Sequence, residues 1–483
     1  MSIVRDRRKH VASLEGASAG VWGQHVRGRL SARERIDVLV DTGSFRAVAP
    51  RSTRAHAGLH VPAEAVIAGR ARVHRRTVYV YAQDAGTGAG ALGHAPATRV
   101  QALLTRALTG PGPVIALLDS PGVPLQAGAE GLAGHAAVLG AQAGLAGRVP
   151  QVALIMGPCA GMAALVPGLA DLTFMVRGTS HAFLTGPEVV RSVAQEPLSA
   201  EALGGAAVHA ARSGVADGVF EDDVEGLLEL RRLCTYLPAG AGEGPPRVAT
   251  SDPPDRAEPS LETLVPCDPR DPFDMAELVQ KVLDEEDLFE LGPEHAPNLV
   301  TGLGRLAGCT VGVVANQPLV RAGCIDTRGA RKGARFLRFC EQFGLPVILF
   351  CDAPGFLPGS SEEYGGLIRD AGGMLGVLAA MRVPRVYVVP RRAYGGAALA
   401  MGIDVGSACR TLAWPGAEVA LMGAQAAAEL IGDRVPEAGS DGRERVDGVV
   451  RPRHTRREIH RALATLRRHR PRRRGSPPGA RRR

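Results

Sequence analysis

Lysine is nearly missing from this chain, and several other features that would mark particular classes of protein are scarce as well. Lys9, Lys281 and Lys332 are its only lysines among 57 basic residues, and aromatic residues make up 4% of the sequence. The eight cysteines are scattered without a Cys-X-X-Cys pair, which argues against a zinc ribbon and a disulfide scaffold. No stretch offers eighteen uninterrupted apolar residues, so we expect no membrane span.

Hydrophobic residues, by contrast, are abundant enough for a large core. They make up 45% of the 483 residues, and a chain about three times the common domain size predicts two large domains. The first residues, MSIVRDRRKHVASLEG, hold charge but lack the apolar run of a signal peptide. We therefore expect a globular protein of the reducing cytoplasm.

The net charge of +8 is concentrated at one end of the chain. From Arg451 to Arg483 there are fourteen arginines and one glutamate, a local charge of +13, so the preceding 450 residues sum to −5. The stretch RREIHRALATLRR (456–468) has the spacing of an amphipathic helix, whereas the residues after it are too rich in Pro, Gly and Arg to order themselves. No aromatic platform accompanies the arginines, so nucleic-acid binding is not expected.

A shift of 233 residues aligns two long stretches of the chain. It places VIAGRARVHRRTVYVYAQD (66–84) on LVTGLGRLAGCTVGVVANQ (299–317), and DSPG (119–122) on DAPG (352–355). A shift of 234 then aligns VPQVALIMGPCAGMAAL with VPRVYVVPRRAYGGAAL. Because the offset stays nearly constant over a hundred residues, the chain is predicted to contain two copies of one fold.

Each copy alternates between two kinds of segment. Short apolar stretches such as VYVYAQD and VIALLD are typical of buried strands, and RVQALLTRAL has helical spacing. This alternation predicts an α/β fold with largely parallel strands in each half. A stretch dense in Pro, Gly and charge, LPAGAGEGPPRVATSDPPDRAEPS, predicts a linker. We place the domains at 1–240 and 266–460, the linker at 241–265 and a disordered basic tail at 461–483.

Glycines stand where matching strands end and helices are expected to begin. Such glycines expose backbone N–H groups and the positive end of a helix dipole, which favour a developing oxyanion. We expect one oxyanion pocket per half, near PCAGMAA in the first half and AYGGAAL in the second. The alternative is that these glycines serve only the tight packing of helix on strand.

A series of motifs, in order along both halves, resembles a known family. The motifs are QDAGTGAGALG, DSPGVPLQAG, IMGPCAG, TSHAFLTGPEVV, VANQPLVRAGCIDT, DAPGFLPG, RRAYGGAALAMG and LAWPGAEVALMGAQ. They are similar to the carboxyltransferase β subunit of biotin-dependent acyl-CoA carboxylases of the acetyl-CoA and propionyl-CoA type. The likeness runs from about residue 25 to 460 and implies two tandem crotonase-like (ClpP-like) domains.

The resemblance implies a reaction and its partners. A carboxyl group passes from carboxybiotin, carried by a biotin carboxylase and carrier α subunit, to the α-carbon of acetyl-CoA or propionyl-CoA, giving malonyl-CoA or methylmalonyl-CoA for fatty-acid or polyketide synthesis. The family implies a hexamer whose sites lie between protomers, with CoA held mainly by the first half and biotin by the second. No lysine lies beside a methionine, so biotin is expected on the partner rather than on this chain, and no metal is expected.

The resemblance implies catalytic backbone donors at Gly396 with Ala397 in the second half and at Gly122 with the preceding position in the first. The substrate-binding positions that it implies are Pro121, Gly161, Gly355, Gly395 and Leu399. Leu399 falls where the family carries a residue linked to acyl-chain choice, although a core role is equally open. Three cysteines and two histidines near the motifs are interpreted as packing residues, namely Cys159, Cys324, Cys351, His135 and His181.

Several residues depart from the family pattern. Where DSGGARIQEG is usual, this chain has Pro121, Pro124 and Ala127, and proline has no N–H to donate. Met162 replaces a second glycine, Gly373 stands where lysine is common, and the segment before VDGVVRP is short.

Three hypotheses follow from these departures. The chain is a working carboxyltransferase with a relaxed first pocket, a degenerate subunit with a structural or regulatory role, or an acyl-CoA decarboxylase or hydratase on the same scaffold. A hydratase would need paired glutamates near the thioester, and none replaces the lost pocket residues. We favour the first.

Overall fold

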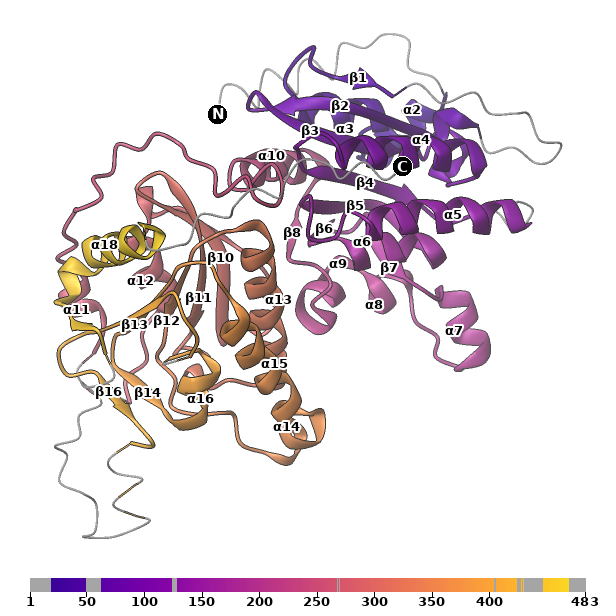
Figure 1. The fold of residues 1–483 in the computed structure, drawn as a ribbon. Coiled ribbons are helices and arrows are strands. Elements are labelled where there is room, and N and C mark those ends of the chain that lie inside the picture. The colour runs from indigo at the N-terminus through magenta and orange to yellow at the C-terminus, as the bar shows by residue number, and fades with distance from the viewer. Residues whose placement is uncertain are drawn as a thin grey trace, which may run out of the picture.

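The computed structural model describes residues 19–468 except for 49–61, 124–127, 267, 269, 404, 424–426, 428 and 430–445. It contains two halves, each built on one mostly parallel sheet, which lie side by side in Figure 1 with the first half at the upper right. The predicted α/β class and duplication are confirmed.

The first sheet has the order β1-β2-β3-β4-β5-β6-β8, and β7 pairs with the end of β5. Its strands are β1 (Arg46–Ala47), β2 (Val66–Val73), β3 (Arg76–Gln83), β4 (Val114–Ser120), β5 (Gln151–Ala160), β6 (Leu172–Val176), β7 (His181–Phe183) and β8 (Gly218–Phe220). The β2–β3 pair is antiparallel, and the strands that follow it in this order run parallel to one another.

The second sheet repeats this topology in the order β9-β10-β11-β12-β13-β15-β17. Its strands are β9 (Leu288–Glu290), β10 (Leu299–Leu306), β11 (Cys309–Asn316), β12 (Val347–Phe350), β13 (Arg385–Val389), β15 (Cys409–Ala413) and β17 (Gly448–Val449), with β14 (Arg392–Tyr394) and β16 (Glu418–Ala420) paired separately. The register is shared: Val66 faces Gln83 in the first half, and Leu299 faces Asn316, 233 residues later, in the second.

Helices cover both sheets (Figure 1). In the described first half they are α2 (Ala19–Val26), α3 (Ala32–Leu39), α4 (His94–Ala107), α5 (Gly128–Ala143), α6 (Leu165–Leu169), α7 (Pro187–Val193), α8 (Ala200–Gly204), α9 (Ala206–Val208) and α10 (Asp223–Cys234). In the second they are α11 (Leu261–Leu264), α12 (Met275–Val282), α13 (Thr327–Phe343), α14 (Ser360–Gly365), α15 (Leu367–Ala380), α16 (Gly395–Ala400) and α18 (Thr455–Arg468).

Local sequence explains where the long helices begin and end. At α3 the Ser31 side chain accepts from the Glu34 N–H while the Glu34 carboxylate accepts from the Ser31 N–H, a capping box. At α13 the Asp326 side chain accepts from the N–H of Gly329. Gly344, with φ of 70°, ends that helix in the left-handed region where glycine is favoured.

One apolar core joins the two halves. It combines side chains of α3 and α10 from the first half with side chains of α13 and α15 from the second. Phe174 lies at the junction, stacked on Phe220 at 5.6 Å between ring centroids and edge-on to Phe289 of the second half at 6.1 Å. The outer faces of the two sheets have cores of their own, with α4 and α5 on the first and α12 and α18 on the second.

The predicted linker and tail differ from the structure at their edges. Within 241–265, Val248 donates to the Gly308 carbonyl and Leu261 is buried in the second-half core, so part of this segment packs on the second half. The helix predicted over 456–468 is confirmed as α18. The boundary at 460 is therefore wrong, because Ala462 and Leu463 are buried in the same core. Residues 469–483 lie outside the described residues.

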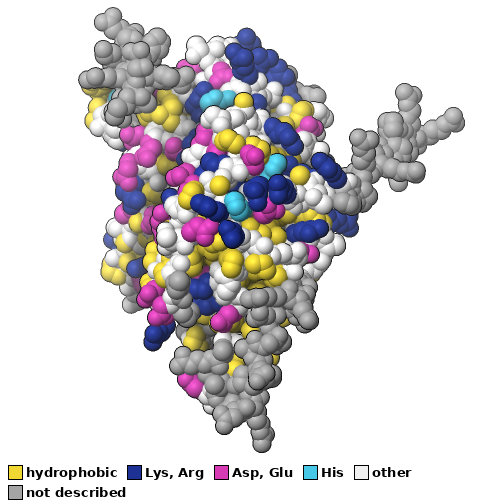
Figure 2. Space-filling model, turned by 90° about the vertical axis from the view of Figure 1, so that its left-hand side faces the viewer, with side chains coloured by type: hydrophobic (Ala, Val, Ile, Leu, Met, Phe, Trp, Pro, Cys, Tyr) yellow, Lys and Arg dark blue, Asp and Glu magenta, His cyan; other side chains and the backbone are white. Residues whose placement is uncertain are grey.

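None of the described helices combines the length and apolarity that a membrane crossing needs. On the face drawn in Figure 2, basic side chains gather from the top to the centre and right of the view, and acidic side chains are more frequent on the left.

The packing of α18 predicts different effects for two truncations. Ending the chain at His460 removes eight residues of α18, including Leu463, and is expected to lower the free energy of unfolding by at least about 2 kcal/mol, as for loss of a buried leucine. Ending it at Arg468 keeps the helix and is the matched control, with no expected loss. Urea unfolding measures both, and equal midpoints for the two chains would contradict this packing.

Candidate active site

In the second half, the turn after β12 lies against the start of α16. The Ala353 N–H donates to the Arg392 carbonyl at 3.0 Å, and the Tyr394 N–H donates to the Ala353 carbonyl at 3.0 Å. Gly355, which follows in the same turn, and the glycines that open α16 are thus held at one end of the sheet. The structure therefore brings together the predicted site residues Gly355, Gly395, Gly396 and Ala397.

The start of α16 presents backbone N–H groups. Gly395 has a φ of 52°, and a Cβ there would lie 2.8 Å from the Leu421 carbonyl oxygen, so only glycine fits. Tyr394 offers no side-chain cap, and the first N–H groups of a helix have no acceptor within it. Gly396 is exposed, Ala397 is 1% exposed and Leu399, on the same helix, is 48% exposed.

The first half has a matching turn at the end of β5. A 3₁₀ turn, η4 (Gly161–Ala164), begins at Gly161, whose φ is 62°, and Ala160 offers it no side-chain cap. The turn after β4 packs on this end, since a Cβ at Gly122 would lie 3.2 Å from the Ala160 carbonyl oxygen. Gly122 donates its N–H to Ser120 Oγ at 3.3 Å, and Pro121 is exposed.

The register of the duplication adds a second pair of donors in the first half. It places Met162 on Gly396 and Ala163 on Ala397. The N–H groups of Met162 and Ala163 are therefore the equivalents of the pair in the second half, whereas Gly122 stays a predicted donor that is already engaged by Ser120.

The proline that departs from the family pattern has a counterpart in this chain. Pro121 aligns with Pro354 of the second half, so the missing N–H at this position is common to both halves. The departures at Pro124 and Ala127 lie outside the described residues.

The two turns belong to different halves of the molecule. In Figure 1, α6, which continues from η4, lies in the upper half, and α16 lies in the lower part of the second half. Within one chain, the two turns therefore belong to different sheets.

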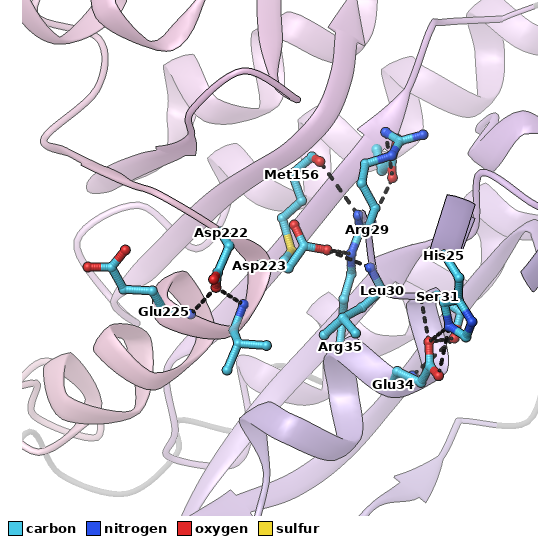
Figure 3. Close-up of polar contacts among 12 residues, drawn as sticks. His25, Arg29, Leu30, Ser31, Glu34, Arg35, Met156, Asp222, Asp223 and Glu225 are labelled. Atoms are coloured by element: carbon cyan, nitrogen blue, oxygen red, sulfur yellow. Dashed lines mark hydrogen bonds and ion pairs between the residues drawn. The ribbon is translucent and has the colours of Figure 1, made fainter. Parts of the chain in front are cut away.

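Next to the first turn, a buried carboxylate is neutralised by two arginines. Asp119, 1% exposed at the end of β4, accepts from Arg29 Nη1 at 3.1 Å and from Arg35 Nη1 at 2.7 Å. Arg35 also donates from Nε to Asp223 at 2.9 Å, and Figure 3 shows its guanidinium beside Asp223 and the Met156 carbonyl. Burial raises the pKa of Asp223, and the Arg35 charge opposes that shift.

The second half holds the aligned carboxylate in a different way. Asp352, fully buried, pairs with Arg391 at 2.7 Å and with Arg392 at 3.3 Å, both from the segment after β13. The register places Arg391 on Gly157. A Cβ at Gly157 would lie 2.0 Å from Asp119 Oδ1 and 2.5 Å from Arg29 Nη1, so Arg29 occupies that space in the first half.

Sequence reasoning missed these arginines, although the repeated aspartate and the Arg-Arg pair after β13 were visible signals. Because both carboxylates are held by cations, they are not free to act as general bases. The chemistry that remains at each turn is backbone hydrogen bonding.

Of the five thiols and imidazoles interpreted as packing residues, three are buried, whereas Cys324 and His181 are half-buried. Cys159 and Cys351 are buried, and burial raises the pKa of Cys159 to about 12 and also raises the pKa of Cys351. His135 is buried in α5, with its Nδ1 3.2 Å from the Gly131 carbonyl. Among the described residues, no cluster of three or more metal-ligating side chains occurs.

Comparisons with known proteins agree with the duplicated α/β fold. Residues 23–469 match the carboxyl transferase domain model. The chain is 44% identical over 484 residues to the propionyl-CoA carboxylase beta chain of Roseobacter denitrificans, covering 95% of each chain. It is 43% identical over 433 residues to the mitochondrial propionyl-CoA carboxylase beta chain of Mus musculus, covering 88% of this chain and 80% of the other.

A solved structure extends this likeness to three dimensions. The transcarboxylase 12S hexamer with hydrolysed methylmalonyl-coenzyme A superimposes with a TM-score of 0.90 at 36% identity, covering 99% of this chain and 97% of that one. The fold and site thus define an enzyme that transfers a carboxyl group to an acyl-CoA. The chain belongs to the carboxyl transferase domain family, within which it is similar to the carboxyltransferase subunits of acyl-CoA carboxylases.

The arginine clusters predict strong effects on stability. Asp119→Asn removes the counter-ion of Arg29 and one of the two carboxylates paired with Arg35. Asp352→Asn removes the carboxylate that Arg391 and Arg392 share. Each substitution is expected to cost about 3–5 kcal/mol of unfolding free energy. Asp37→Asn is the matched control, because Asp37 pairs with Arg33 at the surface and its loss should cost about 1 kcal/mol or less. Thermal or urea unfolding measures all three, and equal effects would contradict the buried pairing.

Proposed function

We propose that this chain transfers the carboxyl group from carboxybiotin to the α-carbon of propionyl-CoA, giving methylmalonyl-CoA. The observation that carries the proposal is the pair of backbone N–H sites at matched strand ends of the two sheets. The relatives named above are propionyl-CoA carboxylase beta chains, which supports propionyl-CoA rather than acetyl-CoA as the substrate.

The reaction needs donors more than it needs a side-chain base. In the transfer the carboxyl group replaces the α-proton, for which the ureido nitrogen that releases the carboxyl group would be the acceptor. Loss of that proton leaves negative charge on the thioester oxygen, and preorganised N–H groups stabilise such charge. We assign this role in the first half to the N–H groups of Met162 and Ala163, with Gly161 allowing the turn and Gly122 as a further predicted donor. The paired state of Asp119 supports a mechanism without a carboxylate base at this turn.

The second half suits the biotin that the family implies. Biotin supplies the activated carboxyl group and a ureido oxygen that requires hydrogen-bond donors. Gly396 is exposed and Ala397 follows it at the start of α16, so their N–H groups lie where a group delivered from outside can reach them. Gly355, Gly395 and Leu399 would surround it. Since this chain has no lysine next to a methionine, biotin would come from a partner α subunit.

The separation of the two turns within one chain supports a site shared between protomers. Apolar side chains are exposed on both halves: Tyr364 is 90% exposed, Ile368 81%, Leu421 86% and Val193 78%. Such surfaces favour association, because burying them removes apolar area from water. We therefore propose a homo-oligomer, a hexamer by likeness to the transcarboxylase 12S hexamer, in which the first half of one protomer meets the second half of another.

A reconstitution assay tests the proposed activity. The purified chain with a biotin-carrying α subunit, ATP and bicarbonate is expected to carboxylate propionyl-CoA faster than acetyl-CoA. Mass spectrometry of the acyl-CoA products measures both. Normal assembly with no product would indicate the degenerate subunit, and loss of carboxyl from methylmalonyl-CoA without the partner would indicate the decarboxylase.

A second prediction isolates one N–H group. Gly396→Pro and Gly396→Ala both add a Cβ, which would lie 3.0 Å from the Phe356 ring, but only proline removes the donor. The proline variant is expected to have a kcat about 100- to 1,000-fold below that of the alanine variant, as for loss of one oxyanion donor. Steady-state kinetics with equal amounts of hexamer measure the ratio, and equal kcat values would remove Gly396 from the catalytic role.

A further inference from the structure

The two halves differ at one matched position inside the candidate sites. At Gly396 a side chain would be crowded, because a Cβ would lie 3.0 Å from the Phe356 ring. The duplication places Met162 on Gly396 and Val123 on Phe356. The second half therefore combines a large residue after the strand turn with a glycine at the donor position, and the first half combines a smaller residue with methionine.

Met162 is not used by the apolar core of the first half. Its neighbour Ala163 and, one turn on, Val166 are 2% and 1% exposed and belong to that core. Met162 is half-buried and lies outside the described core cluster. A Cβ built on Gly161, just before it, would meet no atom within 4 Å, so η4 begins beside open space.

A half-exposed methionine at this point can line a binding site and adapt to the shape of its ligand. Its thioether chain is apolar, unbranched and flexible, and it fills irregular space well. Val123, which aligns with Phe356, has a smaller side chain than phenylalanine, and this difference matches the larger residue at position 162. A ligand that accepts a hydrogen bond from the Met162 N–H would therefore lie next to this side chain.

We propose that the Met162 side chain limits the size of the acyl group that the first half accepts. This inference rests on the proposed function, in which the first half holds the acyl-CoA. The α-substituent of the thioester lies three bonds from the carbonyl oxygen that the N–H groups would hold, so a side chain next to those donors is placed to contact it. Met162 is then a specificity-determining residue, acting from the opposite half to Leu399.

Comparing acyl-CoA chain lengths tests the proposal. Met162→Ala keeps the backbone donor and shortens the wall, so kcat/KM for butyryl-CoA relative to propionyl-CoA is expected to rise at least about tenfold, the usual discrimination per methylene. Leu169→Ala is the matched control, because Leu169 is 41% exposed on the adjoining helix α6 and is expected to leave the ratio unchanged. The double variant Met162→Gly with Val123→Phe copies the two residues of the second half. It is expected to lower the ratio of kcat/KM for butyryl-CoA to that for propionyl-CoA again.

Two outcomes would overturn the proposal. One is an unchanged ratio in a Met162→Ala hexamer that assembles normally. The other is a change in KM for the biotinylated carrier instead of the acyl-CoA, which would place biotin in the first half. Failure of the proposed function is distinguishable, because the wild-type chain would then carboxylate no acyl-CoA. In that event the affinities of the wild-type and Met162→Ala chains for propionyl-CoA and butyryl-CoA, measured by calorimetry, test the size limit. An equal change in affinity for both thioesters would refute it.

Discussion

A buried carboxylate held between guanidinium groups lies at the end of a central strand in each sheet, and both candidate sites depend on it. Asp119 and Asp352 are 1% and 0% exposed, so each would be costly to keep charged without its two arginines. Each aspartate begins the turn whose prolines and glycines lie against the donor segment. The ion pairs therefore fix where the turn leaves the sheet, and they remove the carboxylate from acid–base chemistry.

The duplication preserves this arrangement while changing its parts. In the second half Arg391 and Arg392 reach Asp352 from the next strand, whereas in the first half Gly157 leaves room for Arg29, and Arg35 comes from helix α3. The same carboxylate is thus neutralised by cations that arrive from two different segments. The physical constraint is that the buried carboxylate at the strand end must be neutralised. In each half the local packing decides which arginines neutralise it.

The donor sites show a similar division between what is shared and what differs. Both begin with a glycine in the left-handed region, Gly161 and Gly395, because the backbone must turn sharply from strand to helix. The residue that follows is free to vary, and it is Met162 in one half and Gly396 in the other. An enzyme that joins two unlike reactants needs two sites with the same backbone donors and different lining side chains. A duplicated fold in which the side chains next to the donors have diverged meets that need.

The sequence by itself determined the α/β class, the duplication and the strand-end glycines, because alternating apolar segments and a constant offset of 233 residues are properties of the chain that need no contacts. The helix over 456–468 also followed from its spacing, but its packing on the second-half core did not, and the tail was therefore placed too early. Only the tertiary structure decided that Arg29 and Arg35 meet Asp119 and that Arg35 also meets Asp223, since their positions span nearly two hundred residues. It alone showed that the Gly122 N–H is engaged by Ser120. Contacts between distant segments depend on how the sheets pack, and no local pattern of residues records that.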